Sequence, residues 1–147
     1  MVGKTFKNIK QIENYIKNQI SETLQDDVAK EVTQVMVEDG GVIDREVYQQ
    51  YTPKSYKRTY ELKDPINVES KMINDLTLSL KNIRSDGDRY VAKIVETGIG
   101  YYTSELDEII GARPFHEKTK EELEDNKRHV KAMREGLKKR LGNDVVV

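Results

Sequence analysis

The chain has 147 residues, of which 36% are hydrophobic and 35% charged, and its 25 basic and 26 acidic residues give a net charge of −1. Such a chain can build one modest core, and it has no bulk positive field that would draw it to nucleic acid. The absence of cysteine excludes disulfides, thiolate zinc sites and a cysteine nucleophile. No apolar run approaches the roughly 20 residues that span a bilayer, and no apolar segment follows the basic start. We therefore expect a protein that stays in the compartment where it is made.

The first third of the chain, residues 1–51, has a helical pattern. Apolar residues recur at steps of three and four, which predicts a helix with one apolar stripe: Ile9, Ile12, Ile16, Ile20, Leu24, Val28, Val32 and Val35. Such a helix would be about 45 Å long, more than a small sheet can cover. Its start is either a frayed, solvated end or a stripe that docks on another subunit. Gly40-Gly41 should break the helix before a second helical segment that Pro53 closes.

The segment at residues 51–60 combines tyrosines with basic residues. Such a mixture can stack on bases or bind phosphate. It is also the usual content of protein interfaces and of loops folded over the edge of a core. Because the whole chain is not basic, we favour the second interpretation.

Between residues 66 and 96 the period of the apolar pattern changes to two. Three strands are predicted, around Ile66–Met72, Leu76–Leu80 and Tyr90–Val95, with turn pairs at Asn74-Asp75 and Asp86-Gly87. Together they would form an antiparallel meander with one apolar face on the long helix. The expected fold is therefore a single α+β domain over residues 1–147, with two layers.

A long loop at residues 97–113 and a C-terminal helix at 114–141 complete the predicted domain. Acidic residues come first in the helix and basic residues last, which suits the helix dipole, and Pro114 fits the first turn. Its apolar stripe is narrow, which indicates a helix attached along one seam. The loop has no histidine, cysteine or lysine, and its acids are interleaved with apolar residues.

Few residues are arranged for chemistry. His116 and His129 are too far apart along a polar helix to form a metal pair, so we expect them at the surface. The best catalytic hypothesis combines Asp64 with Glu69 and Lys71, because an acid followed by Glu-x-Lys on a strand is the magnesium site of many nucleases. However, these acids are close in sequence, and Glu69 and Lys71 alternate as on any solvated strand face. We predict no catalytic, cofactor or metal site.

Three short motifs, taken in their order along the chain, resemble a known family. They are Tyr51-Thr-Pro-Lys-Ser-Tyr-Lys-Arg-Thr-Tyr-Glu-Leu, Val95-Glu-Thr-Gly and Ala112-Arg-Pro-Phe. Their order resembles the neck or tail-completion proteins of tailed bacteriophages and prophages, minor head–tail joining components of siphophage type, over most of the chain. Tyr60 stands where that family usually has glycine, and Thr97 where it often has an aromatic residue. The turn after Thr59 can therefore differ here.

The resemblance implies a non-enzymatic virion protein that forms a homo-oligomeric ring between the head and the tail. Its partners would be further copies of itself and phage head-closure, tail-terminator or tail-tube proteins, and DNA would pass without sequence-specific binding. The subunit would be assembled in the bacterial cytoplasm and located in the neck of the virion. Two alternatives remain: a magnesium-dependent nuclease, and a cytoplasmic interaction adaptor unrelated to phage.

The loop between residues 97 and 113 is the predicted contact arm of such a subunit. Glycines fix its start, and Arg113-Pro114 fixes its end. Its alternating acidic and apolar residues suit a short amphipathic segment that lies on a neighbouring subunit. The candidate interface residues are Tyr101, Tyr102, Leu106, Ile109, Ile110, Arg113 and Phe115.

Overall fold

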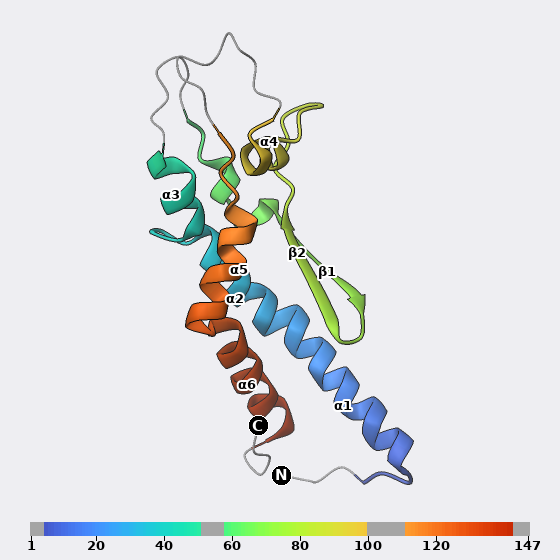
Figure 1. The fold of residues 1–147 in the computed structure, drawn as a ribbon. Helices are drawn as coiled ribbons and strands as arrows, with labels where there is room; N and C mark the ends of the chain where they lie inside the picture. The colour runs from blue at the N-terminus through green and yellow to red at the C-terminus, as the bar shows by residue number, and fades with distance from the viewer. Residues whose placement is uncertain (1–4, 51–57, 100–110, 143–147) are drawn as a thin grey trace.

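The structure is a computed structural model that describes residues 5–50, 58–99 and 111–142 (Figure 1). The predicted long N-terminal helix is confirmed. It consists of α1 (Ile9–Thr23), a π-helical turn called η1 (Leu24–Val28) and α2 (Ala29–Val37), which follow one another along one rod. Asn8 caps its start, since the Asn8 side chain accepts a hydrogen bond from the Gln11 amide at 3.0 Å.

The predicted break at the two glycines is also confirmed. A β-carbon on Gly41 would lie 2.7 Å from the Glu38 carbonyl oxygen, so the chain can turn this closely only at glycine. The helix α3 (Val42–Glu46) follows, and then a 3₁₀ turn at Tyr48–Gln50. Val42 and Ile43 of α3 are fully buried.

A two-stranded antiparallel hairpin is the only sheet in the described part of the chain. Strand β1 (Val68–Asn74) pairs with β2 (Thr77–Asn82), and the turn lies at the predicted Asn74-Asp75 pair. Short 3₁₀ turns at Glu61–Lys63 and Pro65–Asn67 precede β1, so Ile66 lies before the strand and is exposed. The hairpin lies along the rod and contacts η1 and α2.

The predicted third strand is wrong. Residues Val91–Thr97 form the helix α4, which ends at Gly98 in the left-handed conformation (φ 71°). Ala92 and Val95, three residues apart, are its buried side chains, whereas a strand would have buried alternate residues. In so short an apolar run both periods fit the sequence, so periodicity alone could not separate helix from strand. The sheet layer is therefore smaller and the fold more helical than predicted.

The C-terminal helix has the predicted extent but is divided in two. Helix α5 (Phe115–Asn126) ends at Lys127, which adopts a left-handed conformation (φ 57°), and α6 (Arg128–Leu141) continues beyond it. Both helices run beside the N-terminal rod (Figure 1). None of the helices described is long and apolar enough to cross a bilayer.

The core occupies one end of the molecule. Phe115 is fully buried in a cluster that joins α2, α3, α4 and the turn before β1. The buried members of this cluster are Val35, Met36, Val37, Val42, Ile43, Val47, Leu62, Ala92, Val95 and Phe115. At the other end, the first half of α1 contributes no buried side chain.

Away from this core, ion pairs connect the C-terminal helices to the N-terminal rod. Arg128 donates from Nε to Glu31 Oε1 at 2.7 Å and from Nη2 to Glu38 Oε2 at 3.1 Å. The hydrogen bonds from Arg128 hold the pKa of Glu38 below its ordinary value. Arg140 of α6 reaches Asp26 at 3.0 Å and also pairs with Asp27. Most of the predicted apolar stripe, Phe115, Leu123, Met133, Leu137 and Leu141, is buried or half-buried, and these ion pairs add an electrostatic contact along the same seam.

We predict that Gly136→Ala destabilises the protein by about 2 kcal/mol, which urea unfolding will measure. A β-carbon on Gly136 would lie 2.5 Å from Asp27 Oδ2 and 2.6 Å from Thr23 Cγ2, where α6 crosses the rod. Helix propensity alone favours alanine over glycine by about 1 kcal/mol, so the sign of the change is diagnostic. The control Lys139→Ala, at an exposed position of α6, should change stability by less than about 0.5 kcal/mol. A stabilised Gly136→Ala variant would contradict the close crossing.

Candidate assembly surface

The start of α1 exposes an apolar stripe. Ile9, Ile12 and Ile16 are 74%, 40% and 44% exposed and lie at helical spacing on one side of the helix. In Figure 1 this end of α1 projects beyond the other helices. Phe6 packs on Tyr15 with ring centroids 5.3 Å apart, which holds the chain against the start of the rod. The stripe is therefore ordered, apolar and open to a partner.

The hairpin and its flanks add further exposed apolar side chains. Ile66 before β1 is 81% exposed, Ile73 near the turn 66%, and Leu76 in the turn 51%. Ile99, after α4, is 76% exposed. Single exposed apolar residues are normal on a protein surface, and of these four only Ile73 and Leu76 lie together, at the end of the hairpin.

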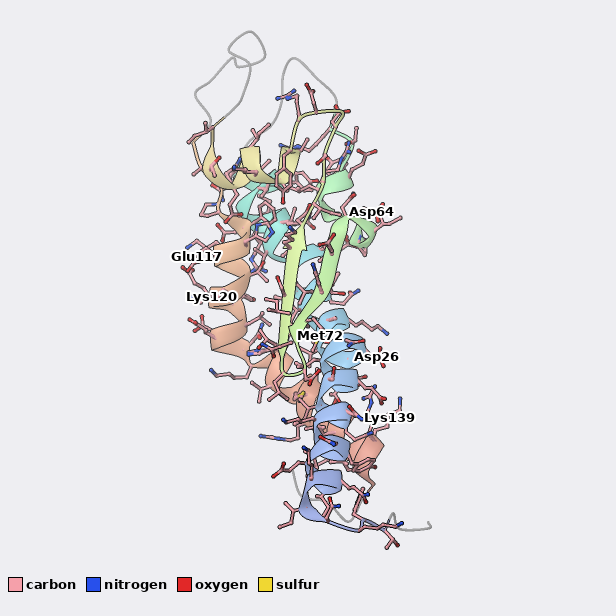
Figure 2. All side chains as sticks on the ribbon, turned by 90° about the vertical axis from the view of Figure 1, so that its right-hand side faces the viewer. Asp26, Asp64, Met72, Glu117, Lys120 and Lys139 are labelled. Atoms are coloured by element: carbon pink, nitrogen blue, oxygen red, sulfur yellow. The ribbon has the colours of Figure 1, made fainter. Side chains whose placement is uncertain are left out.

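The residues of the nuclease hypothesis lie on the solvent side of this hairpin. Glu69 is opposite Lys81 and Lys71 is opposite Ser79, around an open hollow of about 290 Å³. Asp64 instead accepts a hydrogen bond from the Ile66 amide at 3.0 Å and caps the turn before β1. Figure 2 shows Asp64 beside the base of the hairpin and Met72 toward its tip. In the ranges that the structure describes, no three acidic or histidine side chains are grouped as metal ligands.

The predicted contact arm lies mostly outside the described residues, but its ends are defined. Tyr101, Tyr102, Leu106, Ile109 and Ile110 fall in the part that is not described. The two ends touch, since a β-carbon on Gly98 would lie 2.5 Å from the Ala112 nitrogen. The Arg113 amide donates to the Val95 carbonyl at 2.9 Å.

The last two candidate interface residues, Arg113 and Phe115, hold the end of this loop on the core. The Arg113 guanidinium is half-buried, and its Nη1 donates to the Val47 carbonyl at 3.4 Å. Phe115 is 0% exposed within the chain, so its contacts are those of the core. Both residues therefore connect the loop to the subunit's own interior.

His116 connects three elements, contrary to the predicted surface position. Its Nε2 accepts from the Asn82 amide of β2 at 2.9 Å, and its Nδ1 lies 2.9 Å from Glu96 Oε2 of α4. This pattern requires the tautomer with the proton on Nδ1. Asn82 is itself fully buried, and its side chain donates to the Leu62 carbonyl at 2.6 Å. His129 is also half-buried.

The described part of the aromatic and basic segment folds back on the subunit. Arg58 lies 5.0 Å from the centre of the Tyr48 ring and donates to the Tyr48 carbonyl at 2.9 Å. Tyr60 packs edge-on against the same ring, with centroids 5.0 Å apart. Burial raises the pKa of Tyr48 to about 12. These contacts agree with a segment folded over the edge of the core; residues 51–57 are not described.

Tyr60 adopts a left-handed conformation, with φ 60° and ψ 16°. Glycine is the residue that takes this conformation without steric cost. A tyrosine is therefore held here in a backbone conformation that favours glycine.

Comparisons with known proteins identify relatives over most of the chain. The profile of the YomN family matches residues 8–139. The SPbeta prophage-derived protein YomN of Bacillus subtilis (strain 168) is 33% identical over 135 residues, which cover 90% of this chain and 94% of that protein. No solved structure matches the chain significantly.

We predict that Tyr60→Gly is more stable than Tyr60→Ala by about 1 kcal/mol in urea unfolding. Both variants lose the ring contact with Tyr48, so their difference reports the strain of alanine in the left-handed backbone set against the entropic cost of glycine. At an ordinary position the order is reversed, since glycine costs about 0.5–1 kcal/mol relative to alanine. An alanine variant as stable as the glycine variant would disprove the strain.

We also predict that deletion of residues 104–110 leaves the subunit folded. Because Gly98 and Ala112 are in contact, the remaining loop residues still have only a short gap to close. Circular dichroism should show unchanged helix content, and the melting temperature should stay within a few degrees of the parent's. An unfolded deletion variant would place the loop in the core and remove it from the candidate surface.

Proposed function

The chain belongs to the YomN family, and from this premise we propose that it is a structural virion protein of a tailed bacteriophage or prophage. The prophage origin of the Bacillus subtilis relative supports a phage role. The order of motifs that resembles neck and tail-completion proteins supports a place between head and tail.

One observation carries the assembly role. The ordered, exposed stripe of Ile9, Ile12 and Ile16 projects from the subunit on a helix whose other end is fixed in the core. Exposed apolar side chains in a row are costly for a permanent monomer and useful at a subunit contact. In the proposed ring the stripe joins an unlike surface of the next subunit, since contacts between unlike surfaces form a ring when the rotation between subunits closes.

The proposed subunit forms a homo-oligomeric ring and binds the head-closure, tail-terminator or tail-tube proteins of its phage. DNA crosses the ring without sequence-specific binding, which the net charge of −1 supports because the chain has little overall attraction for phosphate. In this role the protein needs no catalysis or cofactor, and its location is the neck of the virion.

The proposal is tested by deleting the gene in a phage or prophage that carries it and restoring it from a plasmid. The deletion should yield separate heads and tails in electron micrographs, and the wild-type gene should restore joined particles. A variant with Ile9, Ile12 and Ile16 all changed to serine should fail to restore them, because it removes the stripe. Infectious particles formed at the normal level without the gene would refute the proposal.

A matched control separates the stripe from the helix that carries it. Lys10, Glu13 and Lys17 are exposed on the same turns of α1, and changing all three to serine removes similar bulk without touching the isoleucines. This control should restore joined particles. Loss of joining with both triple variants would indicate that the helix, and not its apolar stripe, is required.

A further inference from the structure

The outer edge of β1 has unused backbone groups. The Ile83 amide donates to the Asn67 carbonyl at 2.7 Å, so these two residues form a hydrogen-bonded pair at the start of the hairpin. The register continues from this pair with Glu69 opposite Lys81 and Lys71 opposite Ser79. Since ladder bonds alternate in an antiparallel pair, Glu69 and Lys71 bond to β2, whereas Ser70 and Met72 point their amides and carbonyls away from it. Across the three described ranges, these outward groups of Ser70 and Met72 have no hydrogen-bond partner.

The corresponding edge of β2 is covered at its end. The outward Asn82 amide donates to His116 Nε2 at 2.9 Å, and the Asn82 carbonyl accepts from the Tyr90 hydroxyl at 3.1 Å. Figure 2 shows β2 on the side of the hairpin toward α5, and β1 on the side away from it. The alternation deduced for β1 thus agrees with the contacts of β2, whose outer edge is already bonded at Asn82.

We propose that the free protein forms a two-fold dimer in which β1 pairs antiparallel with β1 of a second copy, centred on Ser70. The two Ser70 residues would exchange amide–carbonyl bonds, and each Met72 amide would donate to the Val68 carbonyl of the other copy. The Val68 amide is not needed, because it already donates to the Pro65 carbonyl. The result is a four-stranded sheet made from two hairpins.

Charge selects both the partner and the register. In the centred pairing, Glu69 of each copy lies opposite Lys71 of the other, which gives two ion pairs on the solvent face. Sliding one copy by two residues, the smallest shift that keeps the outward groups paired, places Glu69 opposite Glu69 or Lys71 opposite Lys71. The Glu-Ser-Lys sequence of β1 is therefore complementary to itself in one register, which points to a second copy as the occupant.

The side chains on the other face fit the same pairing. Val68 packs against the core cluster and Met72 is half-buried, while Glu69 and Lys71 are exposed. The centred register places Val68 of one copy opposite Met72 of the other. Apolar residues thus meet on the face toward the helices and charged residues meet on the face toward solvent.

This dimer is distinct from the proposed ring. A two-fold contact uses the same patch on both copies and cannot repeat around a cyclic ring. We therefore assign it to the protein before assembly, where it covers an edge that would otherwise invite uncontrolled strand pairing. The inference stands on the geometry of β1 and can fail without affecting the ring proposal.

Analytical ultracentrifugation of the full chain over a range of concentrations tests the pairing. The wild type should dimerise reversibly, and Lys71→Glu should weaken the dimer by about tenfold or more, because two ion pairs become two repulsions. Lys71 faces the neutral Ser79 within its own hairpin, so this change leaves the hairpin's charge pairs intact. Mixing Lys71→Glu with Glu69→Lys should restore dimers, since each variant then meets its opposite charge.

Two further variants keep the test independent of general charge effects. Lys93→Glu makes the same charge change at an exposed position of α4 and should dimerise like the wild type. Ser70→Pro removes an amide that the hairpin ladder does not use, so it should abolish dimers while the circular dichroism spectrum is unchanged.

Amide exchange identifies the edge directly. Exchange at Ser70 and Met72 should slow as the wild type dimerises, and it should remain fast in Lys71→Glu at the same concentrations. A wild type that stays monomeric at high concentration would overturn the inference. So would a dimer that persists in both Lys71→Glu and Ser70→Pro, or one whose Ser70 and Met72 amides exchange as fast as in the monomer.

Discussion

Phe115 is fully buried where α2, α3, α4 and the turn before β1 meet, and most of the structure depends on that burial. It follows directly after Arg113-Pro114, so the end of the long loop and the start of α5 are placed by one side chain. His116 then joins β2 and α4 to the same point through hydrogen bonds. The hairpin, the described ends of the loop and the last two helices are thus all positioned from one end of the molecule.

Beyond this core, ion pairs are a main connection between the C-terminal helices and the N-terminal rod. Arg128 and Arg140 connect α6 to acidic side chains along the N-terminal rod, and the close crossing at Gly136 brings the helices together. These ion pairs lie beside half-buried apolar side chains of α6, namely Met133, Leu137 and Leu141, so charge and apolar packing together position the helix. The apolar residues Ile9, Ile12 and Ile16 of α1 and Ile73 of the hairpin remain exposed, as the proposed assembly role requires.

Some elements of this fold can be predicted from the sequence and others cannot, for physical reasons. The steps of three and four in the N-terminal rod continue over many turns, and Gly40-Gly41 is a strong break, so both were predictable. The segment from Val91 to Thr97 is too short for its period to be decisive, and its helix is selected by packing Ala92 and Val95 into the core. For His116 and Asn82 there was no sequence signal, because their partners lie far along the chain.

The sequence by itself determined the long amphipathic helix, the hairpin turn and the extent of the charged C-terminal helices, because these follow from local periodicity and turn residues. It also contains the self-complementary Glu69-Ser70-Lys71, but the sequence alone does not show that this segment lies at the edge of a sheet. Only the tertiary structure decided that the outward backbone groups of Ser70 and Met72 in β1 are unpaired among the described residues, that Asn82 at the end of β2 is bonded to His116, and that Phe115 lies in the core. These properties depend on which distant segments pack together, and pattern within a segment carries no information about its neighbours in space.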